Sequence, residues 1–226
     1  MRRCRRIRFG STQRRRLCTG APNAATPQPI RLLHLSDLHC HTATAWDADP
    51  VLRALRGFIA GQIKAGFDPD LVVITGDLAQ AGKAAEYAAA RTWLEALWSM
   101  LNQDRSEPLP RNHLLLVPGN HDVDRDRVRG GVRGIQDGLL AAQSQESVAE
   151  LLQDANEREF VLKPHGAYLD FYGAWLDEPQ PLPWWQRTLH LHGQRLHLAG
   201  LDSAWMAWAL LTATSPAART GRRPST

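Results

Sequence analysis

The hydrophobic pattern of the chain predicts three buried strands that alternate with helices. Apolar residues are continuous at 71–74 and 114–117, as is typical of strands buried on both faces, and they dominate 30–35, where Arg31 and His34 interrupt them. Between these runs, apolar residues recur every three or four positions at about 50–65 and 83–101, as expected of helices with one buried face. This order predicts an α/β fold in which helices cover a parallel or mostly parallel sheet.

Residues at the ends of the first predicted helix support these boundaries. Asp49 can accept hydrogen bonds from the first backbone amides of a helix, and Pro50 fits its first turn. Gly66 is a typical residue at the end of a helix. We expect the buried faces of the two helices to carry Leu52, Leu55, Ile59 and Ile63 in the first, and Tyr87, Leu94, Leu97 and Trp98 in the second.

The second half of the chain has a less regular pattern. We predict a polar loop over 123–134 and a single helix over about 136–156. The aromatic-rich stretch that follows could form a base-stacking or carbohydrate-binding platform, but such residues more often pack in a core or a lid. We therefore interpret it as packing; its members are Tyr168, Phe171, Tyr172, Trp175, Trp184 and Trp185.

Composition excludes several classes of protein. The apolar content of 43% is sufficient for a core, so a wholly disordered chain is excluded. No run approaches the ~18 consecutive apolar residues of a membrane span. Three cysteines without a CxxC motif provide neither a zinc ribbon nor a disulfide framework. This cysteine usage indicates a reducing compartment, and we predict a cytoplasmic location.

Charge is unevenly distributed along the 226 residues. Residues 1–31 hold nine arginines and no acidic residue, whereas 32–226 carry 18 basic and 23 acidic residues, a net charge of −5. We predict that residues 1–29 form a disordered Arg-rich arm, because charge runs are usually solvated tails. Two alternatives stay open for the arm: an organellar transit peptide, or a segment that binds the phosphates of nucleic acid or anionic lipid.

Deleting the arm should leave the melting temperature unchanged, because residues 1–29 show no apolar period that could contribute to a core. Thermal unfolding of the full-length and shortened chains tests this expectation. A fall of several degrees would show that the arm docks on the body of the protein.

Each predicted strand ends in a polar cluster. Asp37 and His39 follow the first strand, Asp77 follows the second, and Asn120 follows the third. Ligands of open α/β sheets bind beyond the carboxyl ends of the strands, so these side chains should converge. Asp37 and His39 would share one face of an extended chain. A mixed set of oxygen and nitrogen donors without thiolate suits Mn, Fe or Zn, and the two oxygens of Asp77 could bridge two cations.

Taken alone, each cluster also suits a structural role. Asp-x-His could be a helix cap beside a surface histidine, and the Gly-Asn-His-Asp sequence could form a turn after a strand. The occurrence of three such clusters at the ends of successive strands favours a metal site.

These residues resemble the calcineurin-like metallophosphoesterases, whose pattern D-x-H, G-D and G-N-H-D/E stands here as Asp37-Leu38-His39, Gly76-Asp77 and Gly119-Asn120-His121-Asp122. The resemblance covers residues 30–122 well and 198–205 more faintly. It implies a four-layer α/β sandwich with a βαβαβ core and helices outside. It also implies two divalent metal ions and a phosphate-ester substrate.

The same resemblance implies a role for each residue of the motifs. Asp37 and His39 would hold the first metal, Asp77 would bridge, and Asn120 would hold the second metal. His121 would face the substrate phosphate, with Asp122 orienting its ring. These two residues are the predicted catalytic pair.

Complete members of the family carry a later G-H-x-H motif, which this sequence lacks. Alternating residues in 188–191 and 195–201 flank His192-Gly193 and indicate a β-hairpin, so we assign His190, His192 and His197 to that hairpin. We therefore expect a phosphoesterase domain at 30–212 that lacks its last strands and is followed by a disordered tail at 213–226. Such a domain would bind one metal moderately and a second weakly, with reduced activity.

Three functions are compatible with the sequence. The leading one is a metal-dependent phosphoesterase that hydrolyses a phosphomonoester or phosphodiester. The second is a catalytically inactive relic that acts as a binding or sensor module. The third, which the acidic body disfavours, is a nucleic-acid-binding protein that uses its arm. The sequence specifies neither the substrate nor the oligomeric state.

Overall fold

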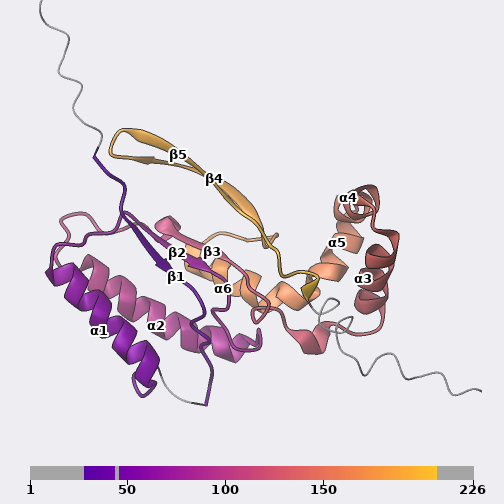
Figure 1. Cartoon of the computed structure of the whole chain (residues 1–226), viewed down its shortest axis with the longest axis horizontal. Helices are drawn as coiled ribbons and strands as arrows, with labels where there is room; N and C mark the ends of the chain where they lie inside the picture. Colours follow the sequence, from indigo (N-terminus) through magenta and orange to yellow (C-terminus); the bar gives the residue numbers. More distant parts are fainter. Residues whose placement is uncertain (1–27, 44–45, 208–226) are drawn as a thin grey trace, which may run out of the picture.

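The computed structural model describes residues 28–43 and 46–207 (Figure 1). The predicted tail and all but the last two residues of the predicted arm therefore lie outside the described residues. No helix in the described ranges is long and apolar enough to cross a membrane.

A three-stranded parallel sheet forms the centre of the fold, as the hydrophobic pattern predicted. Its strands lie in the order β1-β2-β3, and both neighbouring pairs are parallel. Two helices make the connections, and a short 3₁₀ turn precedes the third strand. The elements are β1 (Leu32–Leu35), α1 (Pro50–Lys64), β2 (Leu71–Thr75), α2 (Ala84–Asn102), η1 (Arg111–His113) and β3 (Leu114–Val117).

Helix α1 begins and ends where the capping residues predicted. The Asp49 carboxylate accepts hydrogen bonds from the backbone amides of Val51 and Leu52 at 2.8 and 3.0 Å. Pro50 occupies the first position of the helix. After its last turn Gly66 takes a φ of +93°, a conformation that glycine adopts readily and other residues rarely do.

Three helices cover one face of the sheet, and a hairpin covers the other (Figure 1). On the helical face, α1, α2 and a later helix, α6 (Gly166–Leu176), bury their apolar side chains against alternate residues of the strands, among them Val72 and Ile74. On the opposite face, Leu189 and Leu191 of the hairpin pack against Leu71. The predicted α/β class with a βαβαβ core is thus confirmed.

The aromatic stretch serves packing, as interpreted from the sequence. Tyr168, Phe171, Tyr172 and Trp175 of α6 are all buried. The hydroxyl groups of Tyr168 and Tyr172 donate to the carbonyls of Leu116 and Leu114 at 3.1 Å. Because a buried hydroxyl needs a hydrogen-bond partner, these contacts fix α6 along β3.

The prediction of one helix over 136–156 was wrong, because three helices occupy this part of the chain. Gln143 adopts a left-handed conformation with φ 48°, which ends the first of them. Ser144 and Asp154 then cap the second and third through their side chains. The elements of this region are η2 (Arg125–Arg127), α3 (Gly131–Ala142), α4 (Gln145–Gln153), α5 (Ala155–Leu162) and η3 (Lys163–His165), and Figure 1 shows α3, α4 and α5 as a group beside the sheet.

The predicted polar loop over 123–134 also needs correction. Val123, Val128 and Val132 are buried in a small cluster with Ala204, and α3 already begins at Gly131. The charged residues and glycines between the valines suggested a solvated segment. The valine side of this segment is buried because it packs against Ala204, a contact that the local sequence does not reveal.

The hairpin forms as predicted from β4 (Trp185–Leu191) and β5 (Gln194–Gly200). His192 and Gly193 make its two-residue turn, with φ values of 50° and 73°, as turns of this length require. The His192 Nε2 atom lies 2.7 Å from Asp70 Oδ1, and His197 Nδ1 lies 2.9 Å from the Thr188 hydroxyl. Both histidines therefore have structural partners in or under the hairpin.

The segment after the hairpin returns to the helical group. The side chains of His165 and Asp202 are fully buried, and His165 Nε2 lies 3.1 Å from Asp202 Oδ2. The Gln136 side chain donates to the Trp205 carbonyl at 2.8 Å. These contacts join residues 202–205 to α3 and to the start of α6.

Candidate metal centre

The three predicted clusters lie together beyond the carboxyl ends of β1, β2 and β3. The loop after β1 continues to pair with the loop after β2, because the His39 amide donates to the Asp77 carbonyl at 2.9 Å. The Cys40 amide likewise donates to the Leu78 carbonyl at 2.8 Å. This backbone pairing sets His39 beside Asp77, although 38 positions separate them in sequence.

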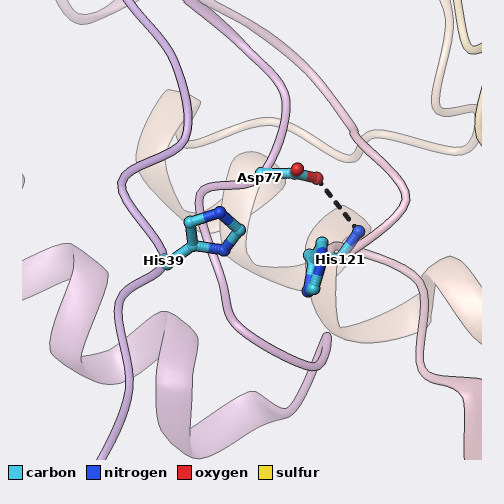
Figure 2. Close-up of side chains that lie close together, drawn as sticks. All are labelled: His39, Asp77 and His121. Atoms are coloured by element: carbon cyan, nitrogen blue, oxygen red, sulfur yellow. Dashed lines mark hydrogen bonds between the residues drawn. The ribbon is translucent and has the colours of Figure 1, made fainter.

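The loop after β3 joins them through a side chain. The backbone amide of His121 donates to Asp77 Oδ1 at 3.0 Å, the contact drawn as a dashed line in Figure 2. The rings of His39 and His121 meet edge to face, with centroids 4.7 Å apart. His39, Asp77 and His121 each offer one donor atom such that all three atoms lie within 4.8 Å of one another.

The donor chemistry of this triad fits a divalent cation. Two imidazoles and a carboxylate, all half-buried, supply the nitrogen and oxygen ligands that Mn, Fe and Zn accept. The Nδ1 atom of His39 is buried without a hydrogen-bond partner among the described residues, and a polar atom in that position calls for a ligand. We therefore regard His39, Asp77 and His121 as residues that could hold a metal ion.

A carbonyl group fixes the ring of His121. Its Nδ1 atom lies 2.7 Å from the backbone oxygen of Gln80. Because a carbonyl oxygen only accepts, Nδ1 carries the hydrogen, and Nε2 is the ring atom available to a cation or a substrate.

Asp122 has different contacts from the ones we expected. The resemblance implied that its carboxylate orients the His121 ring, but the ring Nδ1 atom contacts the backbone oxygen of Gln80 instead. The Asp122 side chain instead points into the protein, where it is 1% exposed and accepts hydrogen bonds from backbone amides and a tyrosine hydroxyl. Burial raises the pKa of this carboxyl group, although the hydrogen bonds oppose that shift.

Asp37 and Asn120 lie next to the triad. Asp37 Oδ1 is 4.0 Å from His39 Nε2, and the Asp37 side chain is largely exposed. Asn120 is half-buried and lies between Gly119 and His121, both of which approach Asp77. The structure thus brings Asp77 and His39 together with His121, with Asp37 next to His39 and Asn120 on the same loop as His121.

The backbone at Asp37 and His39 is left-handed and not extended. We expected both side chains to leave the same face of an extended chain. In the structure Asp37, His39 and Asp77 have φ values of 56°, 45° and 54°. Residues other than glycine adopt this region at a cost of about 1–2 kcal/mol, and such strain concentrates at functional sites.

Two glycines allow the loops after β2 and β3 to approach. A Cβ atom on Gly119 would lie 2.6 Å from the Asp77 backbone nitrogen and would overlap its carboxylate. A Cβ atom on Gly76 would lie 2.9 Å from the Gly119 Cα. Real Cβ atoms do not make contacts this short, so the spacing of the centre depends on glycine at both positions.

The start of α2 organises the loop that carries Gln80. The carboxylate of Glu86 accepts hydrogen bonds from the amides of Ala81 and Lys83 at 2.8 and 3.0 Å. The ammonium group of Lys83 binds Asp124 and also Asp126, at 2.6 Å from the latter. These contacts hold the loop between Asp77 and α2 against the segment that follows His121.

Sequence reasoning missed Gln80 and Glu86 and placed Tyr87 only in the core. Gln80 acts through its backbone oxygen, which leaves no signal in the sequence. Glu86 is the third residue of α2, where a glutamate often accepts hydrogen bonds from the amides before the helix, but Lys83 replaces the Ser or Thr that would complete this sequence signature.

Cys40 follows His39 directly but is not part of the donor triad. Its side chain is 2% exposed. Burial, the largest cause, and the nearby Asp122 charge raise the pKa of the thiol to about 12.

Two comparisons with known proteins agree with this geometry. The profile of the calcineurin-like phosphoesterase family matches residues 30–205. An uncharacterized metallophosphoesterase-like protein of Bacillus subtilis, YydB, is 26% identical over 153 residues, which is 67% of this chain. The match covers only 29% of the length of YydB.

Proposed function

Because the chain belongs to the calcineurin-like phosphoesterase family, we propose that it hydrolyses a phosphomonoester or phosphodiester with two divalent cations held at the ends of β1, β2 and β3. The family and the triad of His39, Asp77 and His121 support a metal-dependent phosphoesterase in general. The number of ions, their identity as Mn, Fe or Zn, and the class of ester belong to the proposal.

The observation that carries the proposal is the convergence of three donors from three separate loops within 4.8 Å. In the proposal Asp77 would serve both cations, His39 and Asp37 would hold the first, and Asn120 would hold the second. When bound, two such cations lower the pKa of a water molecule and neutralise the charge that develops on the phosphoryl oxygens.

The protein's own part in the chemistry is to hold the His121 ring in one tautomer. The Gln80 carbonyl fixes the hydrogen of His121 on Nδ1, which leaves Nε2 as the ring atom available to a ligand. Although its position would also suit a metal ligand, the proposal assigns His121 to the substrate, where Nε2 in its protonated form would donate to the leaving oxygen or to the developing negative charge. Asp122, which accepts no hydrogen bond from the ring, contributes by holding the loops rather than by moving a proton.

Two further expectations stay predictions. The cytoplasmic location rests on cysteine usage, and two of the three cysteines, Cys4 and Cys18, lie outside the described residues. Binding of nucleic acid by the Arg-rich arm concerns residues 1–27, which are also outside them.

Hydrolysis of bis(p-nitrophenyl) phosphate and p-nitrophenyl phosphate tests the proposal. After treatment with EDTA and dialysis, the protein should hydrolyse at least one ester when Mn²⁺ is returned, and Mg²⁺ or Zn²⁺ in parallel assays would identify the preferred ion. Turnover that is the same with EDTA and with Mn²⁺ would contradict a metal-dependent reaction. Tight Mn²⁺ binding without turnover of either ester would support a binding or sensor module instead.

A further inference from the structure

The carboxylate of Asp122 links the two loops that carry Asp77 and His121. It accepts hydrogen bonds from the amides of Leu78 and Ala79 at 3.2 and 2.9 Å, directly after Asp77. It also accepts one from the amide of Gly119 at 2.9 Å, two residues before His121. One buried side chain therefore holds both strand-end loops at the same time.

The fourth donor to Asp122 comes from outside these loops. The hydroxyl of Tyr87, on the first turn of α2, donates to Asp122 Oδ1 at 2.9 Å. It also lies 3.3 Å from the Asp122 backbone oxygen. Tyr87 is 2% exposed, and its ring stacks on Phe171 with centroids 5.2 Å apart.

Tyr87 is well placed to fix the orientation of this carboxylate. Burial raises the pKa of the Tyr87 hydroxyl well above its ordinary value, and the Asp122 charge adds to the effect. The hydroxyl therefore keeps its proton and remains a donor. A buried carboxylate needs every donor it has, because an unpaired charge in the interior is costly.

We propose that Tyr87 and Asp122 form a clamp that sets the separation of Asp77 and His121, and that Tyr87 is a positioning residue for the metal centre. The part of this inference that concerns metal rests on the proposed function. The clamp itself rests only on the hydrogen bonds of Asp122, so the two can be tested separately.

The matched control for Tyr87→Phe is Tyr172→Phe. Tyr172 is also a buried tyrosine, 1% exposed, and its hydroxyl donates to the Leu114 carbonyl at 3.1 Å. Leu114 is the first residue of β3, at the opposite end of the strand from Gly119. Both variants lose one buried hydroxyl, but only Tyr87→Phe loses one that contacts Asp122.

Amide hydrogen exchange tests the clamp without any metal. In Tyr87→Phe we expect faster exchange in the segments around Leu78-Ala79 and Gly119-Asp122, with little change in β3. In Tyr172→Phe we expect the change at β3 and little in the two loops. Unchanged exchange in both loops of Tyr87→Phe would overturn the clamp, whatever the protein does with metal.

Calorimetric titration with Mn²⁺ then tests the positioning role on variants that thermal unfolding shows to be folded. Tyr87→Phe should weaken Mn²⁺ binding about 10-fold or more, the lower end of the effect of groups that orient metal ligands, and Tyr172→Phe should not. Equal Mn²⁺ affinity in both variants would refute the positioning role. If the unaltered protein binds no Mn²⁺ while the exchange pattern is as expected, the proposed function fails and the clamp stands.

Discussion

An Asp77→Asn protein should lose at least about 100-fold in Mn²⁺ affinity and in metal-dependent hydrolysis, while its fold is retained. Removing a group that merely orients a metal ligand costs about 10–100-fold, and Asp77 is itself a member of the donor triad. The asparagine side chain keeps an oxygen that can accept the hydrogen bond from the His121 amide. The substitution therefore removes the negative charge and spares the contact that joins the two loops.

Elemental analysis after dialysis, with hydrolysis of an aryl phosphate ester, measures this effect. Asp37→Asn and Asn120→Ala are the matched controls, because in the proposal each of these residues serves one cation while Asp77 serves both. Asp77→Asn should reduce bound metal more than either control. Equal losses in Asp77→Asn and Asn120→Ala would refute the bridging role of Asp77.

A Gly119→Ala protein should lose both stability and metal binding through a single added methyl group. The new Cβ atom would lie 2.6 Å from the Asp77 backbone nitrogen, so the backbone itself must move. Overpacking of this kind costs typically about 1–3 kcal/mol. In a protein of this size each kcal/mol lowers the melting temperature by roughly 2–4 °C. Because the displaced residue is Asp77, Mn²⁺ affinity should fall as well.

Gly138→Ala is the control for this experiment. Gly138 lies within α3, and a Cβ atom there would meet nothing within 4 Å. Alanine favours a helix over glycine by up to about 1 kcal/mol, so the control should be neutral or slightly stabilised. Calorimetric unfolding and Mn²⁺ titration distinguish the two variants. A Gly119→Ala protein that is as stable as the control and binds Mn²⁺ equally well would show that the loops after β2 and β3 need no close contact.

The positions of the strands and of the candidate ligands could be read from the sequence, because each rests on local properties. A run such as 71–74 is apolar throughout, and only a strand covered on both faces places such a run away from water. The carboxyl ends of parallel strands meet at one edge of a sheet, so the polar residues after each run had to converge. The hairpin followed from His192-Gly193 and the alternation around it, and the cap of α1 followed from Asp49.

The breaks between α3, α4 and α5 were missed for a different reason. Ser144 and Asp154 are caps in the structure, but both residues are also common on the exposed face of a helix. The apolar period alone could not choose between one bent helix and three straight ones. The burial of Val128 and Val132 depends on Ala204, which lies about 70 residues further along the chain.

At the metal centre the sequence by itself determined which donor atoms are present and which loops carry them. The tertiary structure decided in which direction those side chains point. At Asp37 and His39 the backbone is left-handed and not extended as expected, and Asp37 Oδ1 still lies 4.0 Å from His39 Nε2. The carbonyl of Gln80 accepts the hydrogen bond from the His121 ring. The carboxylate of Asp122 accepts hydrogen bonds from the Tyr87 hydroxyl and from backbone amides. These hydrogen bonds involve backbone atoms and residues distant in sequence. The directions of the side chains are therefore fixed only when the loops pack against one another.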